Sequence, residues 1–167
     1  TKADLDLPWL SHQPAQVAGQ DCALARVSFA GELGWEIHAA MADIPALYDA
    51  VIAAGATPFG MYALNAMRIE KGYRGWGAEL TNEVTLLDAD MERFIRFDRK
   101  PDFTGRAATL AQRDAGRSIQ LVYLTVQAGT ADVRGGEPIY SDGRCIGVTT
   151  SGGYGHRTNQ SLGFGYV

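Results

Sequence analysis

Hydrophobic and polar residues alternate along two stretches near the start of the chain, residues 23–29 and 35–39. Alternation with a period of two is typical of a half-buried strand, because successive side chains point to opposite faces of a sheet. A short glycine-containing turn, residues 30–34, joins the two stretches and predicts an antiparallel hairpin. Residues 1–20 contain the breakers Pro8 and Pro14, and we expect them to be irregular.

Three later stretches carry helical signals. Asp43 is a typical residue at the start of a helix, and Pro45 is typical of its first turn. Apolar residues then recur at helical spacing until Gly55, where the helix is expected to end. Residues 61–72 carry two apolar stripes, which predicts a helix that is buried on two sides. A third helix is expected over residues 104–115.

The remainder of the chain predicts strands. These cover residues 118–126, 137–141, 144–150 and 160–167, with an Asp-Gly hairpin turn at 142–143 and a glycine-rich loop at 151–156. The change from mixed helix and strand to strand alone places a boundary near residue 100. The pattern therefore indicates an α+β protein with an α/β part followed by a small β-barrel or sandwich.

Composition excludes several classes of function. The chain has 46% hydrophobic and 20% charged residues and a net charge of -4, so a packed core is expected and nucleic acid is not. No apolar run approaches the roughly 20 residues of a membrane-spanning helix, and the first residues do not resemble a signal peptide. These patterns predict no membrane partner and a cytoplasmic location.

Cysteines and histidines do not form a recognisable metal-binding pattern. Cys22 and Cys145 are far apart, which signals neither a disulfide framework nor a zinc site and favours a reducing compartment. His12, His38 and His156 are isolated from one another in the sequence, so no metal site is predicted. Glycine motifs for nucleotide binding are also missing from the sequence.

Two glutamates flank a glycine-rich turn within residues 26–38. Alternation along the second strand places Glu36 on the face opposite Trp35 and Ile37, and the pattern by itself favours a solvated acid. Glu32, at the turn, is about equally consistent with a structural and a ligand-binding role.

Two further pairs of charged residues are candidates for a role. Asp88 and Asp90 could form a paired-carboxylate site, but two acids at this spacing near a strand are more often solvated. Arg68 and Glu70 lie on the helix predicted to be buried, which favours an internal ion pair.

Four segments of the chain form an ordered set of motifs. They are Arg-x-Ser-Phe-x-Gly-Glu-Leu-Gly-Trp-Glu from Arg26, Met-Arg-Ile-Glu-Lys-Gly-Tyr-Arg-x-Trp-Gly-x-Glu-Leu-Thr from Met67, Asp-Phe-Thr-Gly-Arg from Asp102 and Gly-Val-Thr-Thr-Ser-Gly-Gly-Tyr from Gly147. In order and spacing they resemble the T-protein (aminomethyltransferase) family of the glycine cleavage system, whose folate-binding region is shared by dimethylglycine and sarcosine dehydrogenases. The Glu-Lys-Gly-Tyr-Arg-x-Trp-Gly form is more similar to the dehydrogenases.

The resemblance implies a domain organisation. Residues 1–100 would be the middle, ferredoxin-like α/β subdomain, and residues 101–167 an incomplete C-terminal β-barrel. We expect truncation at both ends, since the chain starts at Thr1 and stops within a predicted strand at Val167. The family's catalytic aspartate, and the dehydrogenases' FAD-binding region, would precede this chain in the same polypeptide. No catalytic residue is therefore expected here, and the chain alone is expected to be inactive.

The resemblance also implies a ligand, tetrahydrofolate. Members of the family bind its pterin ring with a glutamate, and the corresponding residue in this chain is Glu36. The implied reaction transfers a one-carbon unit from an N-methyl amine, dimethylglycine or sarcosine, to give 5,10-methylenetetrahydrofolate. An aminomethyltransferase without flavin and a non-catalytic folate-binding regulator remain alternatives. The chain departs from the pattern at Leu64, where many T-proteins have a folate-contacting arginine, and in residues 85–91.

Overall fold

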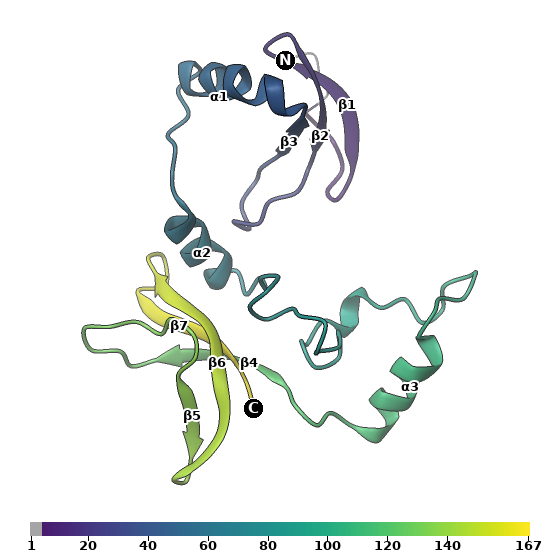
Figure 1. The fold of residues 1–167 in the computed structure, drawn as a ribbon, viewed down its shortest axis with the longest axis vertical. Helices are drawn as coiled ribbons and strands as arrows, with labels where there is room; N and C mark the ends of the chain where they lie inside the picture. The colour runs from purple at the N-terminus through teal and green to yellow at the C-terminus, as the bar shows by residue number, and fades with distance from the viewer. Residues whose placement is uncertain (1–4) are drawn as a thin grey trace. The chain divides into compact units, whose positions relative to one another are not determined.

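The computed structural model of the chain describes residues 5–167, so the first four residues of the predicted irregular start lie outside the described part. The fold divides into two compact units, one ending at Lys71 and the other beginning at Gly72. Each unit contains one antiparallel sheet (Figure 1). The predicted α+β class is confirmed, and the subdomain boundary near residue 100 stays a prediction.

The first sheet has the order β1-β2-β3 and consists of β1 (His12–Val17), β2 (Gln20–Ala25) and β3 (Glu36–Ala39). The predicted hairpin is confirmed in the antiparallel pairing of β2 with β3, in which Leu24 lies opposite Ile37. Buried Ala15 and Leu24 lie on the core face of this sheet.

The prediction of irregular structure over residues 1–20 was wrong for β1. Pro14 lies on this strand, and β1 is an edge strand, where a missing N–H need not break a sheet hydrogen bond. The connection to β2 is a tight turn in which Ala18 and Gly19 both have positive φ, 51° and 80°. Alanine is unusual in such a turn, which is why the sequence did not signal it.

Two helices follow in the first unit, α1 (Ile44–Ala53) after the 3-10 turn η1 (Met41–Asp43), and α2 (Met61–Glu70). Leu47 of α1 is buried. The predicted burial of the second helix on two sides was wrong at its start, because no described side chain covers Met61 or Tyr62, which are 74% and 86% exposed.

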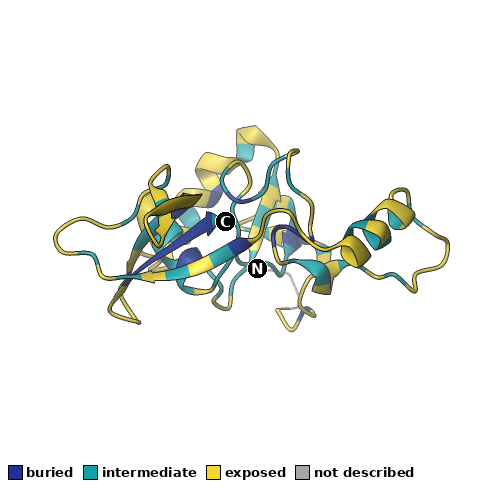
Figure 2. Ribbon diagram, turned by 90° about the horizontal axis from the view of Figure 1, so that it is seen from below, coloured by how far each residue is buried: buried dark blue, intermediate teal, exposed yellow. Residues whose placement is uncertain are grey.

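The second unit contains η2 (Glu92–Phe94), α3 (Arg106–Ala115) and a sheet with the order β4-β7-β6-β5. Its strands are β4 (Leu121–Val126), β5 (Pro138–Ser141), β6 (Arg144–Gly155) and β7 (Gln160–Tyr166). Strand β7 is buried along most of its length (Figure 2). The predicted mostly β character of this part is confirmed.

The predicted loop at residues 151–156 was wrong, because β6 continues as far as Gly155. Its glycines permit close backbone packing. A methyl group placed on Gly152 would lie 2.3 Å from the carbonyl oxygen of Val133. Glycine inside a strand often marks such an approach, and the sequence pattern alone does not distinguish this case from a loop.

Candidate functional site

Glu36, the predicted site residue, begins β3 and faces solvent. Its side chain is 52% exposed, and its Oε2 lies 3.1 Å from Nε2 of His38, two residues further along the strand. Among residues 5–167 this is the only hydrogen bond that the Glu36 carboxylate makes. The exposure agrees with the interpretation from the pattern alone, and it leaves the carboxylate accessible to a ligand.

The sheet register places Glu36 in a row of facing residues. His12 on β1 lies opposite Ala25 on β2, and Ala25 lies opposite Glu36 on β3. In the next row, Ala23 lies opposite His38. Directly opposite residues share a face of a sheet, so all five side chains belong to the face away from Leu24.

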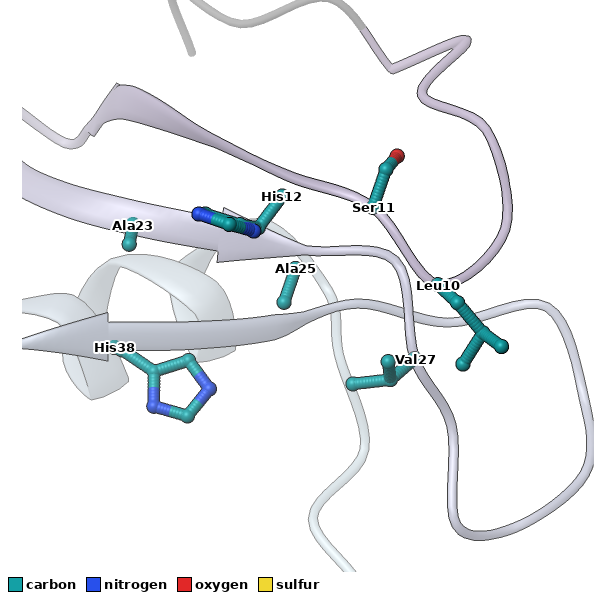
Figure 3. A pocket seen from close by; sticks show the side chains of 7 residues that line it. All are labelled: Leu10, Ser11, His12, Ala23, Ala25, Val27 and His38. Carbon is teal, nitrogen blue, oxygen red and sulfur yellow. The ribbon is translucent and has the colours of Figure 1, made fainter. Parts of the chain in front are cut away.

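A depression of about 260 Å³ lies on this face. Figure 3 shows His12 and His38 on either side of the small side chains of Ala23 and Ala25. The complete lining is Leu10, Ser11, His12, Ala23, Ala25, Val27 and His38. The two histidines are distant in the sequence, and β2 brings both to the same depression. Within residues 5–167, no group of three or more His, Cys, Asp or Glu side chains is arranged to hold a metal ion.

Glu32 has a partner in its own unit. Its Oε1 lies 3.4 Å from Nζ of Lys71, and both side chains are partly exposed. The neighbouring Gly31 has φ +71°, and a methyl group there would lie 2.2 Å from Cγ of Lys71. Lys71 therefore packs on the turn that precedes β3.

The structure separates the two aspartates that the sequence left as a possible pair. Asp88 is buried, and it accepts hydrogen bonds from the Thr85 backbone N–H (2.9 Å), the Thr85 hydroxyl (2.7 Å) and Gln112 (3.0 Å). Asp90 is exposed and pairs with Arg74 at 3.2 Å. Solvation was therefore correctly predicted for Asp90 and wrongly for Asp88, whose carboxylate caps a turn.

Arg68 is buried, as the sequence predicted. Its Nε donates a hydrogen bond to Oδ1 of Asn65 at 2.9 Å. The ion pair between Arg68 and Glu70 stays a prediction.

Sequence reasoning assigned no individual role to Glu79 in the second unit. Its side chain is fully buried and accepts hydrogen bonds from the Gly75 N–H (2.8 Å), the Thr150 hydroxyl (2.6 Å) and the Ser151 hydroxyl. The Tyr166 hydroxyl donates to the backbone carbonyl of Glu79 at 2.8 Å. Burial, with smaller contributions from the negative charges of Asp88 and Glu79, raises the pKa of Tyr166 to about 12. Glu79 therefore connects its turn to β6.

Glu137 was also missed by sequence reasoning. The Thr149 hydroxyl, and then the N–H groups of Arg134 and Gly135, lower the pKa of Glu137 to about 2. The N–H groups donate at 3.0 and 2.9 Å, so the carboxylate fixes the turn that leads into β5. Neither glutamate could be recognised from sequence, since the hydroxyl groups that donate to each side chain come from the distant strand β6.

Comparison with known proteins supports the resemblance. Residues 1–99 match the GCVT N-terminal domain, and residues 120–167 match the glycine cleavage T-protein C-terminal barrel domain. The chain belongs to the glycine cleavage T-protein family. Within this family it is 37% identical to human mitochondrial dimethylglycine dehydrogenase over 163 residues, which are 95% of this chain and 19% of that protein.

Further relatives are aminomethyltransferases. The enzyme of Thermosynechococcus vestitus is 36% identical over 156 residues, which are 93% of this chain and 42% of that protein. The crystal structure of the glycine cleavage system aminomethyltransferase T from Bartonella henselae superposes with a TM-score of 0.88 at 27% identity, covering 99% of this chain and 46% of that one. This T-protein family chain thus spans less than half the length of these relatives.

The comparisons leave the location of the protein a prediction. None of the described helices is both long and apolar enough to cross a membrane. The human relative carries the word mitochondrial in its name, and a cytoplasmic location for this chain remains our expectation from sequence.

Proposed function

We propose that this chain is the tetrahydrofolate-binding part of an enzyme that transfers a one-carbon unit from an N-methyl amine, dimethylglycine or sarcosine, to tetrahydrofolate. The product is 5,10-methylenetetrahydrofolate. The observation that carries this proposal is the 37% identity to dimethylglycine dehydrogenase over 95% of the chain. The resemblance to the family motif implies that Glu36 contacts the pterin, and the exposed position of its carboxylate supports that role.

The chemistry of Glu36 fits a pterin. The ring edge of a pterin presents an N–H and an amino group side by side, and an ionised carboxylate accepts from both in a charge-assisted pair. His38 occupies one position on Oε2 at 3.1 Å. Each carboxylate oxygen has two lone pairs, so Oε2 can accept a second donor while Oε1 accepts the other.

The role of this chain is to bind and orient the folate. Bound tetrahydrofolate supplies the nucleophilic N5, and the Glu36 carboxylate holds the ring so that this atom is fixed in position. We assign amine oxidation to an FAD-containing region, and catalysis of the one-carbon transfer to the family's catalytic aspartate, both in preceding parts of the same polypeptide. The 167-residue chain alone is therefore proposed to be inactive.

A second candidate function is that of an aminomethyltransferase, which uses no flavin. The superposition on aminomethyltransferase T over 99% of this chain favours it. A flavin-binding sequence in the coding region before this chain would support the dehydrogenase, and its absence there would support the aminomethyltransferase. A non-catalytic regulator is less favoured, because Tyr73 follows Lys71-Gly72 where that group is expected to have cysteine.

Replacement of Glu36 by glutamine in the complete enzyme tests the proposal. Glu36→Gln keeps the shape of the side chain but removes the charge and one acceptor. Losing a hydrogen bond to a charged group costs roughly 1.5–3 kcal/mol, so tetrahydrofolate affinity is expected to fall about ten-fold to a hundred-fold. Calorimetry measures this affinity, and product analysis should show a shift from methylenetetrahydrofolate to free formaldehyde.

Stopped-flow reduction of the flavin provides the second measurement. Its rate is expected to be nearly unchanged, because Glu36 is proposed to contact only the folate. Asp49→Asn, on the exposed surface of α1, is the matched control and should change neither quantity. If Glu36→Gln left folate affinity unchanged, or slowed flavin reduction as much as folate capture, the proposed contact with the pterin would be wrong. Glu36 would then be a solvated surface residue.

A further inference from the structure

The second unit contains a pocket of about 360 Å³ that the proposed function does not use. It is lined by residues of three segments, the turn at 85–86, residues 94–103 around the end of η2, and Thr109 of helix α3. All of them belong to the second unit, whereas Glu36 belongs to the first. Pockets for small organic ligands start at roughly 300 Å³, so this one has room for one small molecule.

Hydrogen bonds hold the segments that form this pocket together. Asp88 accepts a hydrogen bond from the hydroxyl of Thr85 at 2.7 Å and another from Gln112 of α3 at 3.0 Å, which ties the turn to the helix. Nε of Arg106, the first residue of α3, donates to the carbonyl oxygen of Phe97 at 2.8 Å. The pocket walls are therefore attached to the same helix.

The apolar part of the lining is partly open to solvent. It consists of Leu86, Phe94, Ile95 and Phe103. Phe94 is 50% exposed and Leu86 is 42% exposed, so no described residue covers them fully. Large apolar side chains gain free energy when a partner removes them from water. Because two of the four are phenylalanines, an aromatic ring is a suitable partner, packing against them in an offset or edge-to-face arrangement.

The polar part of the lining includes two arginines that lack acidic partners. Arg96 and Arg99 are exposed, and within residues 5–167 neither guanidinium group makes a hydrogen bond or an ion pair. Residues 93–100 contain four basic residues and one acidic residue, a net charge of +3, in a chain whose net charge is -4. A guanidinium group matches a carboxylate with two parallel N–H···O hydrogen bonds. The pocket therefore combines an apolar surface with unused donors for an anion.

We propose that this pocket binds a small carboxylate with an aromatic body. The ring packs on Phe94 and Phe103, and the carboxylate accepts hydrogen bonds from Arg96 and Arg99. A concave pocket of this volume favours a small molecule over a peptide, which would need a longer groove. The proposal is independent of the role of Glu36, which lies in the other unit.

Titration of 2-naphthoate into the complete enzyme, followed by calorimetry, tests the proposal. Saturable binding is expected, and Arg96→Gln and Arg99→Gln should each weaken it about ten-fold or more, as expected for the loss of a charge-assisted hydrogen bond. Phe94→Ala should weaken it several-fold. Arg144→Gln, which changes an exposed arginine on β6, is the matched control and should bind as the unchanged enzyme does. The replaced residues are exposed, so the variants should retain their thermal unfolding midpoints.

Related compounds test the two halves of the ligand. The matching amine, 2-naphthylmethylamine, carries the wrong charge, and acetate lacks the ring, so both should bind at least ten-fold more weakly than 2-naphthoate. Glu36→Gln should leave 2-naphthoate binding unchanged, and tetrahydrofolate should not displace it. Failure of this result alone would not affect the proposed folate role of Glu36, which is measured with tetrahydrofolate.

Several results would overturn the pocket proposal. One is the absence of 2-naphthoate binding to the complete enzyme, and another is equal binding by the arginine variants. Displacement by tetrahydrofolate would show that the compound occupies the folate site instead. Tighter, arginine-dependent binding of 2-naphthyl phosphate would identify a phosphate site, and tighter binding of a hexaglutamate peptide would identify a docking surface for an acidic protein.

Discussion

At the scale of single residues, the same carboxylate group serves opposite purposes in Glu36 and Glu79. Glu36 is half exposed and has one partner within residues 5–167, His38, so its carboxylate is open to a ligand. Glu79 is fully buried and is surrounded by donors from Gly75, Thr150 and Ser151. A buried carboxylate is tolerated only when such donors replace water, which identifies Glu79 as a structural group.

Replacing Glu79 should therefore destabilise the second unit. Glu79→Ala removes a charged acceptor and leaves buried donors unpaired, each at a cost of about 1–3 kcal/mol, so we expect a loss of about 3 kcal/mol or more. Urea denaturation followed by circular dichroism measures the free energy of unfolding. Glu83→Ala, an exposed change in the same segment, should be close to neutral. Equal stabilities of the two variants would disprove the structural role of Glu79.

At the scale of secondary-structure elements, a glycine allows β6 to pack closely against a neighbouring backbone. The strand contains Gly152 at a point where the backbone of Val133 approaches closely. It also shows an irregular register against β7 between Thr149 and Ser151. Such irregularities bend a strand and redirect side chains, and here the bend occurs where Thr150 and Ser151 reach Glu79.

Gly152→Ala should destabilise the sheet by about 1–3 kcal/mol, the usual cost of forcing extra atoms into a packed site. The added methyl group would lie 2.3 Å from a backbone oxygen, which cannot move without distorting its segment. Gly129→Ala is the control, because a methyl group there meets nothing within 4 Å. Thermal unfolding should show a lower midpoint for Gly152→Ala than for Gly129→Ala, and coincident midpoints would contradict the proposed close packing.

At the scale of the whole molecule, the ionisation of Glu137 and Tyr166 makes stability depend on pH. The pKa of Glu137 is lowered from 4.5 to about 2, and that of Tyr166 is raised from 10.0 to about 12. A lowered acid pKa means that the folded state favours the charged form, so its contribution is present above pH 4.5 and is lost as the pH falls towards 2. A raised pKa means that the folded state favours the neutral phenol of Tyr166. Its contribution to stability is therefore present below pH 10 and is lost as the pH rises towards 12.

We therefore expect denaturant midpoints to decline on both sides of a neutral plateau. Glu137→Gln should flatten the acid decline, and Tyr166→Phe the alkaline one, because each removes the group whose pKa differs between folded and unfolded states. Glu137 lies at the surface, so added salt should reduce its effect. Unchanged slopes in these variants would show that other groups control the pH dependence.

The sequence by itself determined the family, the α+β class and most of the regular elements. Alternation along residues 35–39 and helical spacing after Asp43 are local properties, and local periodicity is retained whatever the rest of the chain does. The ordered motifs also led to Glu36 as the candidate folate-binding residue. Local signals failed at Ala18 and Gly152, where the allowed conformation depends on a turn or on a distant backbone.

Only the tertiary structure decided which side chains meet. His12 and His38 are distant in sequence, and both line the depression on the first sheet because β2 lies between their strands. Glu79 and Asp88 look like ordinary surface acids until β6 supplies donors to Glu79 and Gln112 of α3 supplies one to Asp88. The physical reason is that burial and hydrogen bonding depend on contacts between segments far apart in the chain, and a local pattern does not contain that information.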